Sequence, residues 1–156
     1  MAEFKIGIGL PTMGETETLG ITGGIRATAR HVEELGLDSV GASDLITGDG
    51  TPSLESTVAL AAAAALTDRV HDGFSVFVLP LRPVAWMAAQ IATLQHVSGN
   101  RVILEVGSGG FPGTPFWRAA GGPARERGRM TDAALEVLPQ LIAGEPTRLE
   151  PWNFSA

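Results

Sequence analysis

Two stretches of the chain decide the fold: Phe74-Ser-Val-Phe-Val-Leu-Pro80 and Val102-Ile-Leu-Glu-Val-Gly-Ser-Gly-Gly110. Each is a short run rich in β-branched, aromatic and aliphatic residues that ends in glycine, serine or proline. In α/β proteins the chemistry lies at the carboxyl ends of parallel strands. The two stretches therefore predict strands whose ends carry a binding or catalytic site.

The rest of the chain alternates predicted strands and helices. Strands are expected at residues 5–10, 37–43, 71–80 and from 101 onward, and helices at 22–35, 54–66, 83–97 and from 123 to about 138. Thr51-Pro52 is a typical helix start, and Pro139 should kink or end the last helix. Strand-helix units repeating every ~30 residues imply a parallel sheet with right-handed crossovers.

Four such units make half of a TIM barrel, which typically needs about 250 residues. We expect an α/β half-barrel domain over residues 1–144 and an irregular tail over 145–156. An open parallel sheet leaves two unpaired edges and one uncovered face. The fold therefore predicts completion of the barrel by a homo-oligomer or by a partner chain that supplies the second half.

Composition excludes several classes of protein. The 156 residues are 44% hydrophobic and 18% charged, which is typical of a compact globular domain. The 17 acidic against 11 basic residues, a net charge of −6, argue against nucleic-acid or anionic-membrane partners. There is no cysteine, and the three histidines show no metal-ligand spacing, so no metal site is expected. No leader or long apolar segment is evident, so a cytoplasmic location is expected.

Three positions stand out within this pattern. The first predicted strand alternates apolar side chains with Gly7 and Gly9, and such bare backbone suits either close approach by a ligand or tight packing. Glu105 is expected on the sheet face opposite the helices, where a wet or partner-lined interior would spare an unpaired carboxylate its cost of burial. Asp44 ends the second strand and is equally well explained as a catalytic group or as a turn cap.

Six short motifs are spread over the chain: Gly36-Leu-Asp-Ser-Val40, Ser43-Asp44, Leu79-Pro-Leu-Arg-Pro83, Gln90-Ile-Ala-Thr-Leu94, Ser98-Gly-Asn-Arg101 and Glu126-Arg-Gly-Arg129. Together they resemble the bacterial luciferase-like superfamily of flavin-dependent monooxygenases and oxidoreductases that use the deazaflavin coenzyme F-420. The resemblance runs from about residue 5 to 150 and is most specific over 74–109. Members of the family are longer, so it covers only their first four strand-helix units.

The resemblance implies a flavin-type cofactor, FMN or coenzyme F-420, and a small organic substrate. Asp44 matches an aspartate near the cofactor ring and is the predicted catalytic residue. Ser75-Val76 matches a cis peptide bond behind the ring, and residues 107–109 match a loop that approaches it. The implied cofactor-binding residues are Asp44, Ser75, Val76, Gly107, Ser108 and Gly109.

The chain also departs from the family. Deazaflavin-using members commonly have histidine and glutamate where this chain has Leu45 and Gly110, so the acid/base groups of that branch are absent. The favoured hypothesis is a luciferase-like oxidoreductase or monooxygenase module, since in flavoproteins the cofactor carries the hard chemistry. The alternatives are a truncated non-catalytic paralogue that serves as a structural or assembly partner, and a fragment of a full-length barrel enzyme. The sequence leaves the substrate unassigned.

Overall fold

The protein is described by a computed structural model over residues 4–13, 23–45, 52–110, 113–122 and 124–148. Four parallel strands form one sheet in the order of the chain: β1 (Gly7–Gly9), β2 (Ser39–Ala42), β3 (His71–Val78) and β4 (Val102–Gly107). The other elements are α1 (Gly24–Leu35), α2 (Ser56–Ala64), the 3-10 helix η2 (Leu79–Leu81), α3 (Val84–Ser98), α4 (Pro115–Ala120) and α5 (Arg127–Ile142). These strands and interleaved helices confirm the predicted α/β fold.

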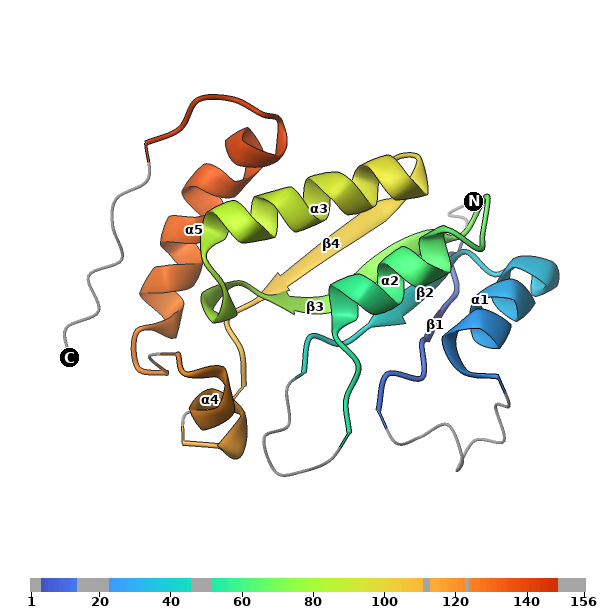
Figure 1. The fold of residues 1–156 in the computed structure, drawn as a ribbon, viewed down its shortest axis with the longest axis horizontal. Helices are drawn as coiled ribbons and strands as arrows, with labels where there is room; N and C mark the ends of the chain where they lie inside the picture. Colours follow the sequence, from blue (N-terminus) through green and yellow to red (C-terminus); the bar gives the residue numbers. More distant parts are fainter. Residues whose placement is uncertain (1–3, 14–22, 46–51, 111–112, 123, 149–156) are drawn as a thin grey trace.

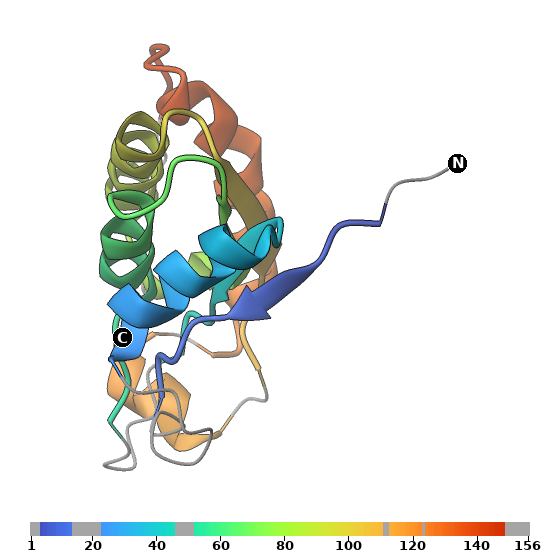
Figure 2. The same ribbon diagram turned by 90° about the vertical axis from the view of Figure 1, so that its right-hand side faces the viewer.

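The helices cover one face of the sheet. α2 and α3 lie side by side along it, and α1 and α5 flank them (Figures 1 and 2). The core lies between this face and the helices, and its largest fully buried side chains belong to Phe74, Phe77, Leu60, Leu79, Met87 and Leu94. Burial of this apolar surface is the main stabilising contribution to such a layered fold.

The opposite face of the sheet is open and nearly bare. Gly9, Gly41 and Gly73 pair in register across three strands, and Ile103 completes the row. Ile103 is 40% exposed, and Glu105 on the same strand is exposed. Glu105 thus lies on the sheet face opposite the helices, as expected.

One irregularity interrupts the sheet. The pairing between β3 and β4 shifts between Phe74 and Phe77, because two residues lie between these positions on β3 and only one lies between their partners, Leu104 and Val106, on β4. This bulge directs both phenylalanine rings into the core, with centroids 4.6 Å apart, and leaves Ser75 and Val76 exposed. Two consecutive side chains therefore lie outside the core in the carboxyl-terminal half of β3.

Several helix predictions need correction. α2 spans Ser56–Ala64 rather than 54–66, and the Glu55 side chain accepts a bond from the Val58 N–H at its start; Thr51 lies outside the described residues. α5 continues past Pro139 to Ile142, since proline removes only one N–H and the Pro139 carbonyl still accepts from Ala143. α4 lies in a segment predicted as loop. Among the described residues, no helix is long and apolar enough to cross a bilayer.

A buried ion pair ties the amino ends of β3 and β4 together. Asp72 is fully buried, and one carboxylate oxygen lies 3.5 Å from Arg101 Nη1. Neither oxygen accepts a hydrogen bond, because the guanidinium instead donates to the carbonyls of Ala64, Thr67, Val70 and Ser98. Burial raises the pKa of Asp72 to about 7, despite the opposing charge of Arg101.

This pair makes stability depend on pH. The folded protein keeps the Asp72 proton up to about pH 7, whereas the unfolded chain loses it near 3.8. The folded state binds the extra proton in that window, so this group's contribution to the free energy of unfolding falls as pH rises through it. The free energy of unfolding of D72N, measured relative to that of the wild type, should therefore rise by up to about 4 kcal/mol from about pH 4 to about pH 8. Urea unfolding of both proteins measures this, and a pH-independent difference would contradict it.

Candidate functional site

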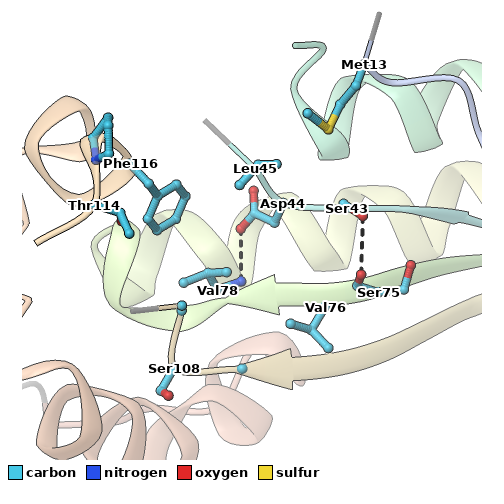
Figure 3. Close-up of a pocket in the computed structure, with 14 residues that line it drawn as sticks. Met13, Ser43, Asp44, Leu45, Ser75, Val76, Val78, Ser108, Thr114 and Phe116 are labelled. Atoms are coloured by element: carbon cyan, nitrogen blue, oxygen red, sulfur yellow. Dashed lines mark hydrogen bonds between the residues drawn. The ribbon is translucent and has the colours of Figure 1, made fainter. Parts of the chain in front are cut away.

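A cavity of about 770 Å³ opens at the carboxyl ends of β2, β3 and β4 (Figure 3). The strand ends form one side of it, and the first turn of α4 forms another. Its lining is mostly apolar, with a few hydroxyl groups. The lining residues are Met13, Ser43, Asp44, Leu45, Ser75, Val76, Val78, Gly107, Ser108, Gly109, Gly110, Thr114, Pro115 and Phe116.

The structure brings every predicted cofactor-binding residue to this one cavity. Asp44 comes from the end of β2, Ser75 and Val76 from the β3 bulge, and residues 107–109 from the end of β4. Their roles stay predictions, but their convergence is a fact of the fold. The two departures from the family pattern, Leu45 and Gly110, line the same cavity.

Sequence reasoning missed the α4 side of the site. Thr114 and Phe116 face the strand ends from α4 (Figure 3), and Thr114 is the N-cap of that helix with Pro115 directly after it. A threonine-proline pair is a typical helix start, so the signal was present. The surrounding glycines and prolines favoured a loop instead.

Close packing fixes the bulge against the end of β4. The Ser75–Val76 peptide bond is cis, as the resemblance implied, and the Ser43 hydroxyl donates to the Ser75 carbonyl at 3.4 Å. A Cβ built on Gly107 would lie only 2.6 Å from Val76 Cγ2. Glycine at this position therefore allows the Val76 side chain to lie against β4.

The loop after β4 is held by Trp117 of α4. Gly109 has a φ of 80°, and a Cβ there would lie 2.6 Å from the Trp117 ring and 3.0 Å from Val78 Cγ1. The Trp117 indole is buried and packs edge-on against Phe116, with centroids 5.4 Å apart. The glycine lets the backbone approach the indole, which places residues 107–110 at the cavity wall.

Asp44 is buried, and both of its carboxylate oxygens are bonded. Oδ1 accepts from the Ser56 hydroxyl at 3.1 Å and from Arg82 Nη2 at 2.6 Å. Oδ2 accepts from the Val78 N–H at 2.9 Å and from Arg82 Nη1 at 2.6 Å. This saturated arrangement favours a role in orienting the strand ends over direct proton transfer.

The ion pair controls the charge of the site. Burial opposes the charged guanidinium of Arg82, but the bonds and charges of Asp44 and Glu55 outweigh it and raise the pKa of Arg82 above its ordinary value. Asp44 is the one carboxylate among the described lining residues, and Arg82 neutralises it. In the described ranges, no group of three or more histidine, aspartate or glutamate side chains could hold a metal ion.

Comparison with known proteins gives the same picture as the geometry. The family model described as luciferase-like monooxygenase matches residues 6–156. The chain belongs to this family. A 4-hydroxyprotoasukamycin monooxygenase from Streptomyces nodosus subsp. asukaensis is 32% identical over 123 residues, 74% of this chain and 33% of that protein. An uncharacterized protein of Mycobacterium tuberculosis is 37% identical over 97 residues, 62% of this chain and 33% of its own length.

Solved structures share the fold of this luciferase-like chain. The monooxygenase RslO1 from Streptomyces bottropensis superposes with a TM-score of 0.80 at 24% identity, covering 97% of this chain and 46% of that one. The oxygenating constituent of 3,6-diketocamphane monooxygenase from Pseudomonas putida, in complex with FMN, gives a TM-score of 0.77 at 20% identity, covering 99% and 44%. An F-420-dependent secondary alcohol dehydrogenase gives 0.71 at 22%, covering 97% and 46%. The chain thus spans less than half of each structure.

The packing of the glycine loop predicts a contrast between two neighbours. Gly109→Ala should lower the free energy of unfolding by roughly 2–4 kcal/mol, because it adds a methyl group at positive φ against the buried Trp117. Gly110→Ala is the matched control, since a Cβ there meets nothing within 4 Å, and should change stability by less than about 0.5 kcal/mol. Urea unfolding of both variants decides, and equal effects would refute this account of the loop.

Proposed function

We propose that the chain contributes the cofactor site of a luciferase-like oxidoreductase or monooxygenase that uses FMN or coenzyme F-420 on a small organic substrate. The observation that carries the proposal is that the six residues implied by the family resemblance all line one cavity. Of the structures with the same fold, the diketocamphane monooxygenase constituent is in complex with FMN and the secondary alcohol dehydrogenase with an F-420–acetone adduct. The family match does not favour the alternative of a non-catalytic paralogue.

The cavity suits a flat, largely apolar ring. Its volume of about 770 Å³ lies within the ~300–1,000 Å³ typical of ligand sites. Val76 and Val78 offer apolar contact beside the glycine loop, and Phe116 offers it from α4. The backbone of residues 107–110 lies at the wall, where a side chain on Gly107 or Gly109 would have to displace its neighbours.

In this proposal the cofactor and the chain have separate tasks. A bound flavin or deazaflavin supplies the redox chemistry. Val76, Val78 and Phe116 exclude water from the ring, while the hydroxyls of Ser75 and Ser108 are available for hydrogen bonds. The Ser43 hydroxyl donates to the Ser75 carbonyl and can still accept a hydrogen bond. The catalytic role of Asp44 stays a prediction, and its four bonds fit a residue that fixes the strand ends.

Titration with FMN and, separately, with coenzyme F-420 tests the proposal by fluorescence. We expect saturable binding of one of them at roughly micromolar affinity. Val76→Ala should weaken it about three- to tenfold, because it removes apolar contact from the cavity wall. Val58→Ala is the matched control, since Val58 is 70% exposed on α2 and does not line the cavity. If neither cofactor shows saturable binding to the chain at concentrations up to about 100 μM, the proposed function is wrong.

We also propose that further strands pair with β1 and β4 to complete a barrel. β1 and β4 are the edges of the described sheet. Apolar side chains are exposed at both: Phe4 (90%), Ile6 (58%) and Ile8 (42%) at or before β1, and Ile103 (40%) on β4. A parallel sheet with open edges and one uncovered face is unusual in proteins. The missing strands would come from a second copy, from another half-barrel, or from the continuation of a longer chain of which this sequence is a part.

Self-association of this chain tests that arrangement. Light scattering of the purified chain should give at least a dimer at about 10 μM, because edge pairing between two copies would cover both open faces. Replacing Ile6 and Ile103 with lysine should shift the equilibrium toward the monomer, since it places charge at both edges. A wild-type chain that stays monomeric at about 100 μM would exclude closure by a second copy.

A further inference from the structure

Two buried arginine-aspartate pairs lie at opposite ends of the same sheet. Arg101 and Asp72 join the amino ends of β3 and β4, with side-chain exposures of 13% and 0%. Arg82 and Asp44 lie at the carboxyl ends of β3 and β2, with exposures of 15% and 2%. The two pairs consist of the same residue types and are similarly buried, but only the second lies beside the cavity.

The Arg82 guanidinium is the centre of a cluster that joins three segments. It binds Asp44 after β2 through two nitrogens at 2.6 Å and Glu55 at the start of α2 at 3.3 Å. Its Cζ lies 4.7 Å from the centroid of the buried Phe77 ring. Arg82 itself directly follows η2, so the end of β3, the end of β2 and the first turn of α2 share one cation.

A series of contacts connects Arg82 to the cavity wall. Asp44 Oδ2 accepts the Val78 N–H at 2.9 Å, and Val78 lies two residues after Val76 of the β3 bulge. The stacked Phe77 lies between the bulge and Val78. The position of the bulge is therefore coupled both to the carboxylate that Arg82 holds and to the ring that Arg82 covers.

We propose that Arg82, which is not among the described residues lining the cavity, is a positioning residue of the cofactor site that acts through Asp44 and Phe77 on the β3 bulge. The assignment of a cofactor to the cavity rests on the function proposed above. The planar guanidinium matches a carboxylate with two parallel bonds and stacks on an aromatic face, which a lysine ammonium cannot do. Arg82→Lys therefore keeps the positive charge but removes the two parallel bonds to Asp44 and the stacking on Phe77.

Amide hydrogen exchange tests the positioning without any cofactor. In Arg82→Lys, protection of the Val78 N–H should fall about tenfold relative to wild type, because its acceptor Asp44 loses the two-pronged contact that holds it. Arg101→Lys is the matched control and should spare the Val78 N–H when the variants are compared at equal global stability. Equal protection of Val78 in the two variants would overturn the proposal. If Arg82→Lys does not fold, Glu55→Gln removes the charge from the outer contact with Arg82 while leaving an amide oxygen to accept the Val58 N–H of α2, and it should show the same shift on a smaller scale.

The cofactor readout separates positioning from general destabilisation. At saturation with FMN or coenzyme F-420, Arg82→Lys should alter the visible absorption spectrum of the bound ring, whereas Arg101→Lys should reproduce the wild-type spectrum. A bound spectrum unchanged in Arg82→Lys would refute the positioning role while leaving the proposed function intact. Failure of the wild type to bind either cofactor would refute the proposed function, and the exchange experiment would still decide the role of Arg82.

Discussion

The register shift between β3 and β4 is the constraint on which the arrangement of the site depends. Regular alternation would place only one of any two consecutive β3 side chains on each face. With one extra residue, Phe74 and Phe77 both enter the core, and Ser75 and Val76 are both left outside it. The same bulge thus supplies the largest buried rings of the strand and one wall of the cavity. Glycine at 107 is its counterpart on β4, because any larger residue would meet Val76.

The two ends of the sheet use buried charge in different ways. At the amino end, Arg101 donates mainly to backbone carbonyls, and the carboxyl group of Asp72 accepts no hydrogen bond. At the carboxyl end, every oxygen of Asp44 is bonded. A half-satisfied pair holds chain segments together at a cost that varies with pH, whereas a saturated pair gives a fixed geometry. Fixed geometry is what a binding site requires, and it is found at the end of the sheet that carries the cavity.

Much of this could be predicted from the sequence, for identifiable reasons. The strand at 102–107 followed from simple alternation, and α1 from its apolar stripe and Gly36, which is its C-cap. A local signal was misleading where the same dipeptide occurred at two positions. Thr51-Pro52 and Thr114-Pro115 both look like helix starts, yet α2 begins at Ser56 and α4 begins at Pro115. Arg82 was missed as a partner of Asp44 because the two are 38 residues apart, and no local pattern reports a contact that only the packed strand ends create.

The open face of the sheet determines which part of the site this chain supplies and which part must come from other strands. Gly9, Gly41 and Gly73 form a row without side chains on this face, so whatever covers this row must fill the space itself or the interior stays wet. The described chain supplies the bulge, the glycine loop and the α4 wall, all at the rim of the strand ends. Contacts within the chain itself hold these elements, so this wall of the cavity does not depend on whatever covers the open face. The covering strands would then shape the remainder of the cavity, where a substrate is distinguished from others.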